Sequence, residues 1–286
     1  MGFRSWCGLL AAAVLFSGCS QSAAPTPTPG MSTAPTVATA APTPTPEPTP
    51  SYSTWPLGER ALPLRPDGFG EIRATPPSLR ERRYPTVDLL APPADGRFSS
   101  SIGPVTDEIL EQMGETYQPG CPVTPEDLRY VQVVFRGFDG AAHTGELVVA
   151  ASEAAGIVSV FRTLFRLDFP IEEMRLITTA DLEAPATGDG NNTAAFICRP
   201  TRGQASLLSA HAYGLALDVN PFLNPYAKDD VVLPERASSY LDRDRVRPGM
   251  IEADGPVVRA FARIGWSWGG DFRTLEDYQH FSALAR

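Results

Sequence analysis

The sequence predicts an α+β fold, a small antiparallel sheet with helices packed on it, preceded by a disordered Pro/Thr-rich stretch. Leu128–Phe135 and Thr144–Ala150 are rich in β-forming residues and flank a turn with two glycines, which predicts a hairpin. Ser152–Phe165 has apolar side chains at helical spacing, with Ser152 as the expected N-cap. Gly255–Ile264 is a further helix candidate, closed by Gly265.

The first 18 residues have the pattern of a signal peptide. Arg4 precedes an apolar run, Leu9–Phe16, which is shorter than the roughly 20 residues that span a bilayer. Phe16-Ser17-Gly18-Cys19 resembles a bacterial lipobox, in which cleavage before the cysteine frees it for acylation. We therefore expect an extracytoplasmic protein, anchored to the bacterial cell membrane by a lipid on Cys19.

Residues 19–54 form the expected tether. Nine of the 29 prolines lie between Pro25 and Pro50, alternating largely with Thr, and Glu47 is the one charge up to Thr54. Such a stretch favours polyproline II, and about 35 residues at roughly 3.1 Å each extend on the order of 100 Å. That length reaches from the membrane into the cell wall.

The folded part is expected in two sections. Residues 55–103 are rich in Pro and Arg and show little periodicity, so we expect irregular chain wrapped on the domain that follows, 104–286. Within that domain Thr106–Gly114 predicts a short helix with Thr106 as N-cap. Met174–Ile177 is a candidate strand, and Leu217–Val219 has the apolar character of a buried one.

Charge and cysteine content narrow the class of protein. The formal net charge of −9 argues against a nucleic-acid partner, because no basic stripe is available to bind the phosphates. We also expect the protein to be a monomer. Of four cysteines, Cys7 would leave with the signal peptide and Cys19 would carry lipid. Cys121 and Cys198 remain, which predicts a disulfide in an oxidising compartment; the alternative is two buried free thiols.

Two of the three histidines lie in distinctive surroundings. His211 precedes Asp218 by seven residues. Asp218 lies between apolar neighbours, and burial of its carboxylate there is costly unless it is paired or bound to metal. Two imidazoles and one carboxylate are a sensible catalytic zinc set, and His280 can supply the third ligand. Asp277, three residues before His280, is placed for a general base. His143 lies in the predicted hairpin turn and is expected to be structural.

The combined motifs resemble a known family of peptidases. Ser209-Ala-His-Ala-Tyr-Gly-Leu-Ala-Leu-Asp218, then Gly265-Trp-Ser-Trp-Gly-Gly-Asp271, then Asp277-Tyr-Gln-His-Phe281 resemble the zinc D-alanyl-D-alanine carboxypeptidase and L-alanyl-D-glutamate endopeptidase superfamily. These enzymes cut stem peptides of bacterial peptidoglycan and have the hedgehog/DD-peptidase fold.

The resemblance implies one Zn²⁺ per chain and a role for each matching residue. His211, Asp218 and His280 match the zinc ligands, and Asp277 matches the catalytic acidic residue. Arg199 matches the active-site arginine, which either stabilises an oxyanion or grips a substrate carboxylate. The substrate-binding candidates are Ser209, Tyr213 and Trp268, and Trp268 has core packing as its equal alternative.

The scissile bond and the activity itself stay open at this stage. Asp-x-x-His resembles the L-alanyl-D-glutamate endopeptidases more than the carboxypeptidases, which often have Glu-x-x-His. The alternatives to a peptidase are a non-catalytic, zinc-containing, peptidoglycan-binding lipoprotein and a structural wall lipoprotein without metal.

Overall fold

The computed structural model describes residues 51–201 and 204–284, so the expected signal peptide, Cys19 and nearly all of the tether lie outside the described residues. Within them the helices are α1 (Asp107–Met113), α2 (Ala154–Arg166), α3 (Thr179–Glu183) and α4 (Pro256–Ala262). The strands are β1 (Ser100–Pro104), β2 (Leu128–Arg136), β3 (Ala142–Ala150), β4 (Glu173–Met174), β5 (Asn192–Thr193), β6 (Pro200–Thr201), β7 (Gln204–Leu208), β8 (Ala216–Asp218), β9 (Tyr226–Lys228), β10 (Val231–Leu233), β11 (Ser267–Trp268), β12 (Glu276–Asp277) and β13 (His280–Ser282).

The arrangement is α+β, with small antiparallel sheets, as the sequence predicts. The sheets have the strand orders β1-β2-β3, β10-β9-β12 and β11-β13-β8, and β4 and β5 form a parallel pair. The predicted hairpin is confirmed as β2 and β3, and the helices predicted over Ser152–Phe165 and Gly255–Ile264 are confirmed as α2 and α4. The helix expected over Thr106–Gly114 is confirmed as α1.

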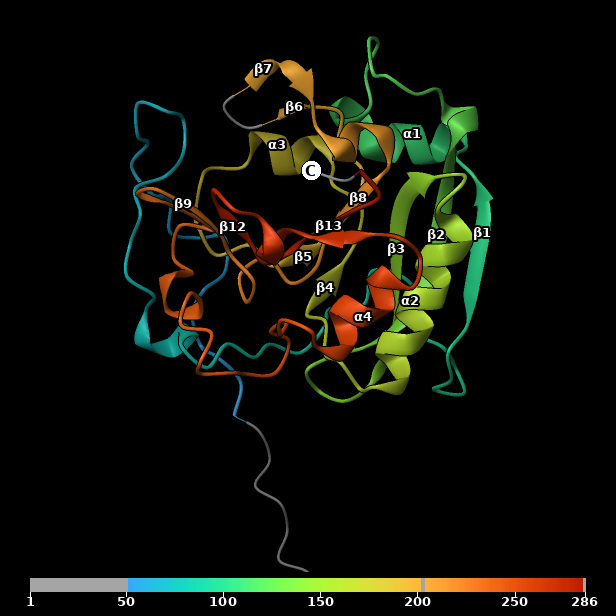
Figure 1. Cartoon of the computed structure of the whole chain (residues 1–286). Helices are drawn as coiled ribbons and strands as arrows, with labels where there is room; N and C mark the ends of the chain where they lie inside the picture. Colours follow the sequence, from blue (N-terminus) through green and yellow to red (C-terminus); the bar gives the residue numbers. More distant parts are fainter. Residues whose placement is uncertain (1–50, 202–203, 285–286) are drawn as a thin grey trace, which may run out of the picture. The chain divides into compact units, whose positions relative to one another are not determined.

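Helix α2 lies across the β2–β3 hairpin, and α4 lies beside α2 (Figure 1). The apolar face of α2 is buried as predicted, with Ile157, Phe161 and Leu164 each at most 1% exposed. The prediction of Ser152 as N-cap is wrong, because the helix begins at Ala154 and the Ser152 hydroxyl donates to the Glu153 side chain instead. The strand expected over 174–177 is shortened to β4.

The sheet β11-β13-β8 connects this core to the candidate site. Strand β13 pairs antiparallel with β8, so His280 lies directly opposite Asp218 and Phe281 opposite Leu217. The Phe281 ring stacks on Phe261 of α4 with centroids 3.7 Å apart, and Phe281 is fully buried. Burial of Phe281 on one face of β13 therefore turns the neighbouring His280 to the other face.

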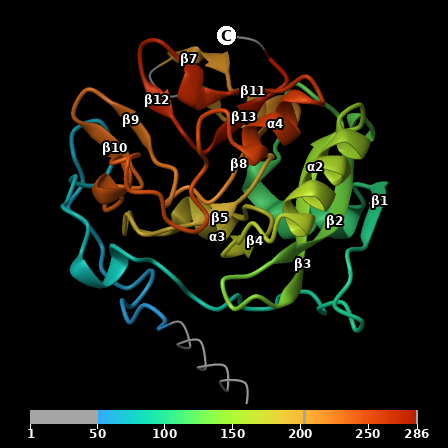
Figure 2. The same cartoon turned by 60° about the horizontal axis from the view of Figure 1, so that its bottom comes forward.

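Residues 55–103, called the N-terminal arm from here, run past β9 and β10 and then on toward β1 (Figure 2). They have little regular structure, as expected. The arm is fixed by Arg82, whose guanidinium is buried, pairs with Glu172 and donates to the Asp189 carbonyl at 2.8 Å. Leu79 of the arm packs in a buried cluster with Phe222 and Tyr240, so the arm shares a core with the rest of the domain.

No helix among the described residues is long and apolar enough to cross a membrane.

Candidate metal centre

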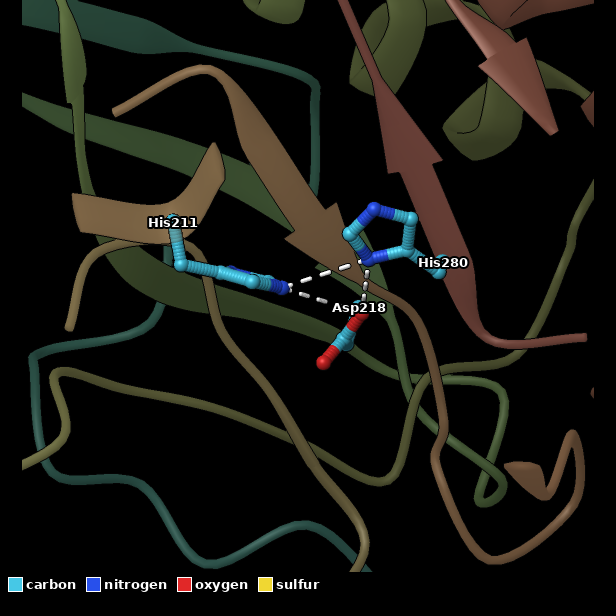
Figure 3. A group of neighbouring side chains, drawn as sticks. All are labelled: His211, Asp218 and His280. Atoms are coloured by element: carbon cyan, nitrogen blue, oxygen red, sulfur yellow. Dashed lines mark hydrogen bonds and ion pairs between the residues drawn. The ribbon is translucent and has the colours of Figure 1, made fainter. Parts of the chain in front are cut away.

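Three side chains from distant parts of the chain converge on one point (Figure 3). His211 comes from the 3₁₀ turn η4 (Ala210–Tyr213), Asp218 from the end of β8, and His280 from the start of β13. His211 Nε2 lies 3.3 Å from His280 Nδ1 and 3.4 Å from Asp218 Oδ1. His280 Nδ1 lies 3.0 Å from the same carboxylate oxygen.

The separations of these three atoms fit a metal ion. Zinc bonds to imidazole nitrogen and carboxylate oxygen are roughly 2.0–2.2 Å, so two ligands of a tetrahedral ion lie about 3.3–3.5 Å apart. The observed edges of 3.0, 3.3 and 3.4 Å form nearly that triangle. Among the described residues, this is the one group of three or more His, Cys, Asp or Glu side chains found close enough to hold a metal.

The electrostatics of the triangle also suit a cation. His211 Nδ1 is hydrogen-bonded to the Ala195 carbonyl, which makes Nδ1 the donor and turns the Nε2 lone pair toward the centre. Burial alone would raise the pKa of the Asp218 carboxyl, but the charge and hydrogen bonds that His211 and His280 supply when their imidazoles are protonated outweigh it and hold that pKa well below its usual range. The centre therefore presents an ionised carboxylate beside imidazole nitrogens.

The turn that carries His211 explains two residues of the motif. Ser209 is the N-cap of η4, and its hydroxyl accepts the His211 backbone N–H at 3.4 Å. Gly214 ends η4 at φ +67, and a Cβ there would lie 2.4 Å from the backbone nitrogen of Ala150. Both residues position the turn on the end of β3, and glycine is required for the close approach.

Two cavities meet at the centre. The larger, about 440 Å³, includes His211, Asp218, Arg199 and Gln279 in its walls and extends to Phe69 of the N-terminal arm. The smaller, about 100 Å³, shares these four residues and adds His280, Ser209, Tyr226, Lys228 and Asp277. Of the three candidate metal ligands, His211 and Asp218 thus line both cavities, and His280 lines the smaller one.

Asp277 lines the smaller cavity, and Arg199 lines both. Asp277 is half-buried in β12 and accepts a hydrogen bond from the Gln279 amide at 3.3 Å. A Cβ on Gly269 would lie 2.5 Å from the Asp277 carbonyl, so the first glycine of the Gly-Gly-Asp motif lets that turn approach closely. Arg199 is half-buried, lines both cavities and donates to the Pro200 carbonyl.

The structure separates the three substrate-binding candidates. Ser209 lines the smaller cavity, where it also caps η4. Trp268 has the core role instead, because it is 4% exposed and its indole N–H donates to the Tyr278 carbonyl at 2.8 Å. Tyr213 is half-buried at the end of η4 and is not among the described residues that line either cavity.

The predicted disulfide between Cys121 and Cys198 is present, with Cα atoms 5.7 Å apart. Cys198 directly precedes Arg199, and its backbone N–H donates to the Thr116 carbonyl at 2.9 Å. The bridge therefore fixes the backbone from which Arg199 projects. His143 is buried away from the site, between the carboxylates of Asp88 and Asp139, which agrees with a structural role.

Sequence reasoning did not find Lys228, Glu235 and Gln279, which also line the cavities. Gln279 lies inside the Asp277–Phe281 motif, so its position next to His280 was visible in the sequence. Lys228 lies at the site because its strand β9 pairs with β12. Glu235 lies there beside the N-terminal arm, whose Gly70 donates a hydrogen bond to it. Neither of these long-range contacts has a local sequence signal.

Residues 202–283 match a family model described as D-alanyl-D-alanine carboxypeptidase. The matched segment holds His211, Asp218, Asp277 and His280, although it spans less than a third of the chain. The match confirms the resemblance to this superfamily and supports a peptidase. No curated protein and no solved structure matches the chain.

Proposed function

We propose that the protein is a zinc-dependent peptidase that hydrolyses peptide bonds of peptidoglycan stem peptides, on a hedgehog/DD-peptidase type of fold. The observation that carries the proposal is the triangle of His211 Nε2, Asp218 Oδ1 and His280 Nδ1, with edges of 3.0–3.4 Å. When bound there, zinc supplies a Lewis acid and lowers the pKa of water.

The chain's own residues account for the proton transfers. Asp277 lines the small cavity that also holds all three metal ligands. Its carboxylate takes the proton of the attacking water and returns it to the nitrogen of the departing amine as the C–N bond breaks. Arg199 lies at the junction of the two cavities, where its guanidinium stabilises negative charge on the former carbonyl oxygen or holds a substrate carboxylate.

The unequal cavities favour removal of a terminal residue. The cavity of about 100 Å³ has room for one small residue, and Lys228 and Arg199 in its walls suit a terminal carboxylate. The amino-terminal part of the peptide then extends into the cavity of about 440 Å³. We therefore propose D-Ala-D-Ala carboxypeptidase activity ahead of L-Ala-D-Glu endopeptidase activity, which the Asp277-Tyr-Gln-His280 spacing keeps as the second candidate.

The proposed location is extracytoplasmic, with a lipid on Cys19 and residues 19–54 as the tether into the cell wall. The disulfide between Cys121 and Cys198 supports an oxidising compartment. The proposed partners are the stem peptide and, through the lipid, the membrane, with the protein acting as a monomer.

The test is incubation of the protein with defined muropeptides, read by mass spectrometry with and without a chelator. We expect loss of one terminal alanine, abolished by the chelator and by Asp277→Asn, which retains zinc. Cleavage between L-Ala and D-Glu would establish the second candidate. Bound zinc without hydrolysis of any muropeptide would favour the non-catalytic binding protein, and hydrolysis unaffected by the chelator would contradict the proposal.

A further inference from the structure

A buried carboxylate that the proposed reaction does not use lines the larger cavity. Glu235 follows β10 and is 7% exposed. One of its oxygens accepts the backbone N–H of Gly70, in the N-terminal arm, at 2.8 Å. Glu235 shares the cavity walls with His211 and Asp218, so the carboxylate belongs to the same space as the metal ligands.

Two glycines make room for this side chain. A Cβ on Gly70 would lie 3.1 Å from Glu235 Oε1, and a Cβ on Gly188 would lie 3.0 Å from Glu235 Cβ. Gly188 also has φ +67 and accepts the Arg236 backbone N–H at its carbonyl. The arm and the loop around Gly188 therefore hold the carboxylate in one position.

The neighbouring cations have other partners. Arg236 donates to the carbonyls of Thr187 and Arg60, and its guanidinium lies 5.0 Å from the centre of the Trp55 ring. Arg175 pairs with Asp181, a second acidic residue in the cavity wall, so that carboxylate is already neutralised. The third, Asp218, belongs to the candidate metal centre. Over residues 51–201 and 204–284, no ion pair involves Glu235.

A buried carboxylate with one neutral hydrogen-bond donor is poorly compensated, since burial removes most of its hydration. A cation delivered by a ligand would gain a charge-assisted hydrogen bond there. Lys228 lines the smaller cavity, together with Asp218 and Asp277, and Arg199 lines both cavities. Glu235 is therefore found in the larger cavity and Lys228 in the smaller one, while His211 and Asp218 line both.

We propose that Glu235 binds an ammonium group of the substrate, carried by a diamino-acid residue on the amino-terminal side of the scissile bond. The inference rests on the proposed function and specifies its substrate class: peptides with a free side-chain amine. It also gives the N-terminal arm a role, since Gly70 holds the carboxylate that selects the substrate.

The experiment uses the full chain with zinc and two synthetic pentapeptides that end in D-Ala-D-Ala. They differ in one group: the lysine side chain at the third position is free in one and Nε-acetylated in the other. We expect the free amine to raise kcat/KM about tenfold or more, the usual size for a charge-assisted hydrogen bond. Glu235→Gln keeps an oxygen for the Gly70 N–H but removes the charge. It should therefore abolish the preference for the free amine and change kcat/KM on the acetylated peptide by no more than about twofold.

Glu71→Gln is the matched control, because Glu71 neighbours Gly70 but is exposed and pairs with Arg73; it should leave the preference intact. Equal kcat/KM values for both peptides in the unaltered protein, or an equal loss of kcat/KM on both peptides in Glu235→Gln, would overturn the proposal. Should Glu235→Gln fail to fold, the comparison of the two peptides on the unaltered protein decides.

If neither peptide is cleaved, the proposed activity on these peptides fails, and the amine site is tested separately by calorimetric binding of the same peptides. A preference of about tenfold for the free amine, lost in Glu235→Gln, would support the site. Equal binding, or no binding of either peptide, would overturn it.

Discussion

Gly214→Ala should destabilise the protein by more than its backbone conformation alone accounts for. An L-residue in the left-handed region costs about 1–2 kcal/mol, and Gly214 has φ +67. The added methyl would also lie 2.4 Å from Ala150 N and 2.9 Å from the carbonyl carbon of Val149, both backbone atoms that cannot rotate away. Overpacking of this kind costs about 1–3 kcal/mol more, so we expect a total of about 2–5 kcal/mol.

Gly140→Ala separates the two contributions. Gly140 has φ +78 in the β2–β3 turn, but nothing lies within 4 Å of its added Cβ. Gly140→Ala should therefore lower the free energy of unfolding only by the cost of the left-handed backbone conformation, about 1–2 kcal/mol. Urea unfolding of both variants measures the difference, and equal losses would refute the packing argument.

A zinc titration of the same two variants tests the connection to the metal centre. Relief of the clash at Gly214 must move η4 away from β3, and His211 moves with it. Loss of such supporting geometry typically weakens metal affinity about 10–100-fold. We expect that loss for Gly214→Ala and unchanged affinity for Gly140→Ala; unchanged affinity in both would show that η4 does not position His211.

Three further predictions concern stability. Arg82→Met leaves the buried Glu172 carboxylate without its partner and should cost about 3–5 kcal/mol in urea unfolding; a loss below 1 kcal/mol would show that the arm is not anchored there. Cys121→Ser opens the Cys121–Cys198 bridge, which spans 77 residues, and should cost about 2–4 kcal/mol; equal stability of the variant and the unaltered protein under oxidising conditions would contradict this. Burial alone would raise the pKa of Asp181, but hydrogen bonds from Arg175 and Thr178 outweigh it and hold that pKa below 3.8. Asp181 therefore stabilises the fold above pH 3.8 and loses this contribution as the pH falls through its folded pKa. The stability gap between the unaltered protein and Asp181→Asn should shrink on acidification, and a gap that grows would contradict the sign.

The elements that the sequence predicted well depend on local signals. The β2–β3 hairpin follows from two segments rich in β-forming residues around glycines, and α2 follows from its apolar stripe. The three side chains of the candidate metal centre were identifiable because their motifs are short and distinctive. The disulfide followed from cysteine arithmetic.

The elements that were missed or left open depend on long-range packing. For Trp268 the sequence left substrate binding and core packing as equal alternatives, and only the tertiary contact of its indole N–H with the Tyr278 carbonyl favours the core. Ser152 is not the N-cap because α2 begins one residue later than that cap requires, so Glu153 takes the position. Glu235 is a single carboxylate without a motif, and the N-terminal arm that holds it lies 165 residues away in sequence.

The measurement that tests the central claim most directly is the metal content and zinc affinity of the full chain, for the unaltered protein, Asp218→Ala and Asp277→Asn. The converging ligands predict one zinc per chain in the unaltered protein, its loss in Asp218→Ala and its retention in Asp277→Asn. A protein that takes up no zinc, or that holds it equally well without the Asp218 carboxylate, would contradict the account.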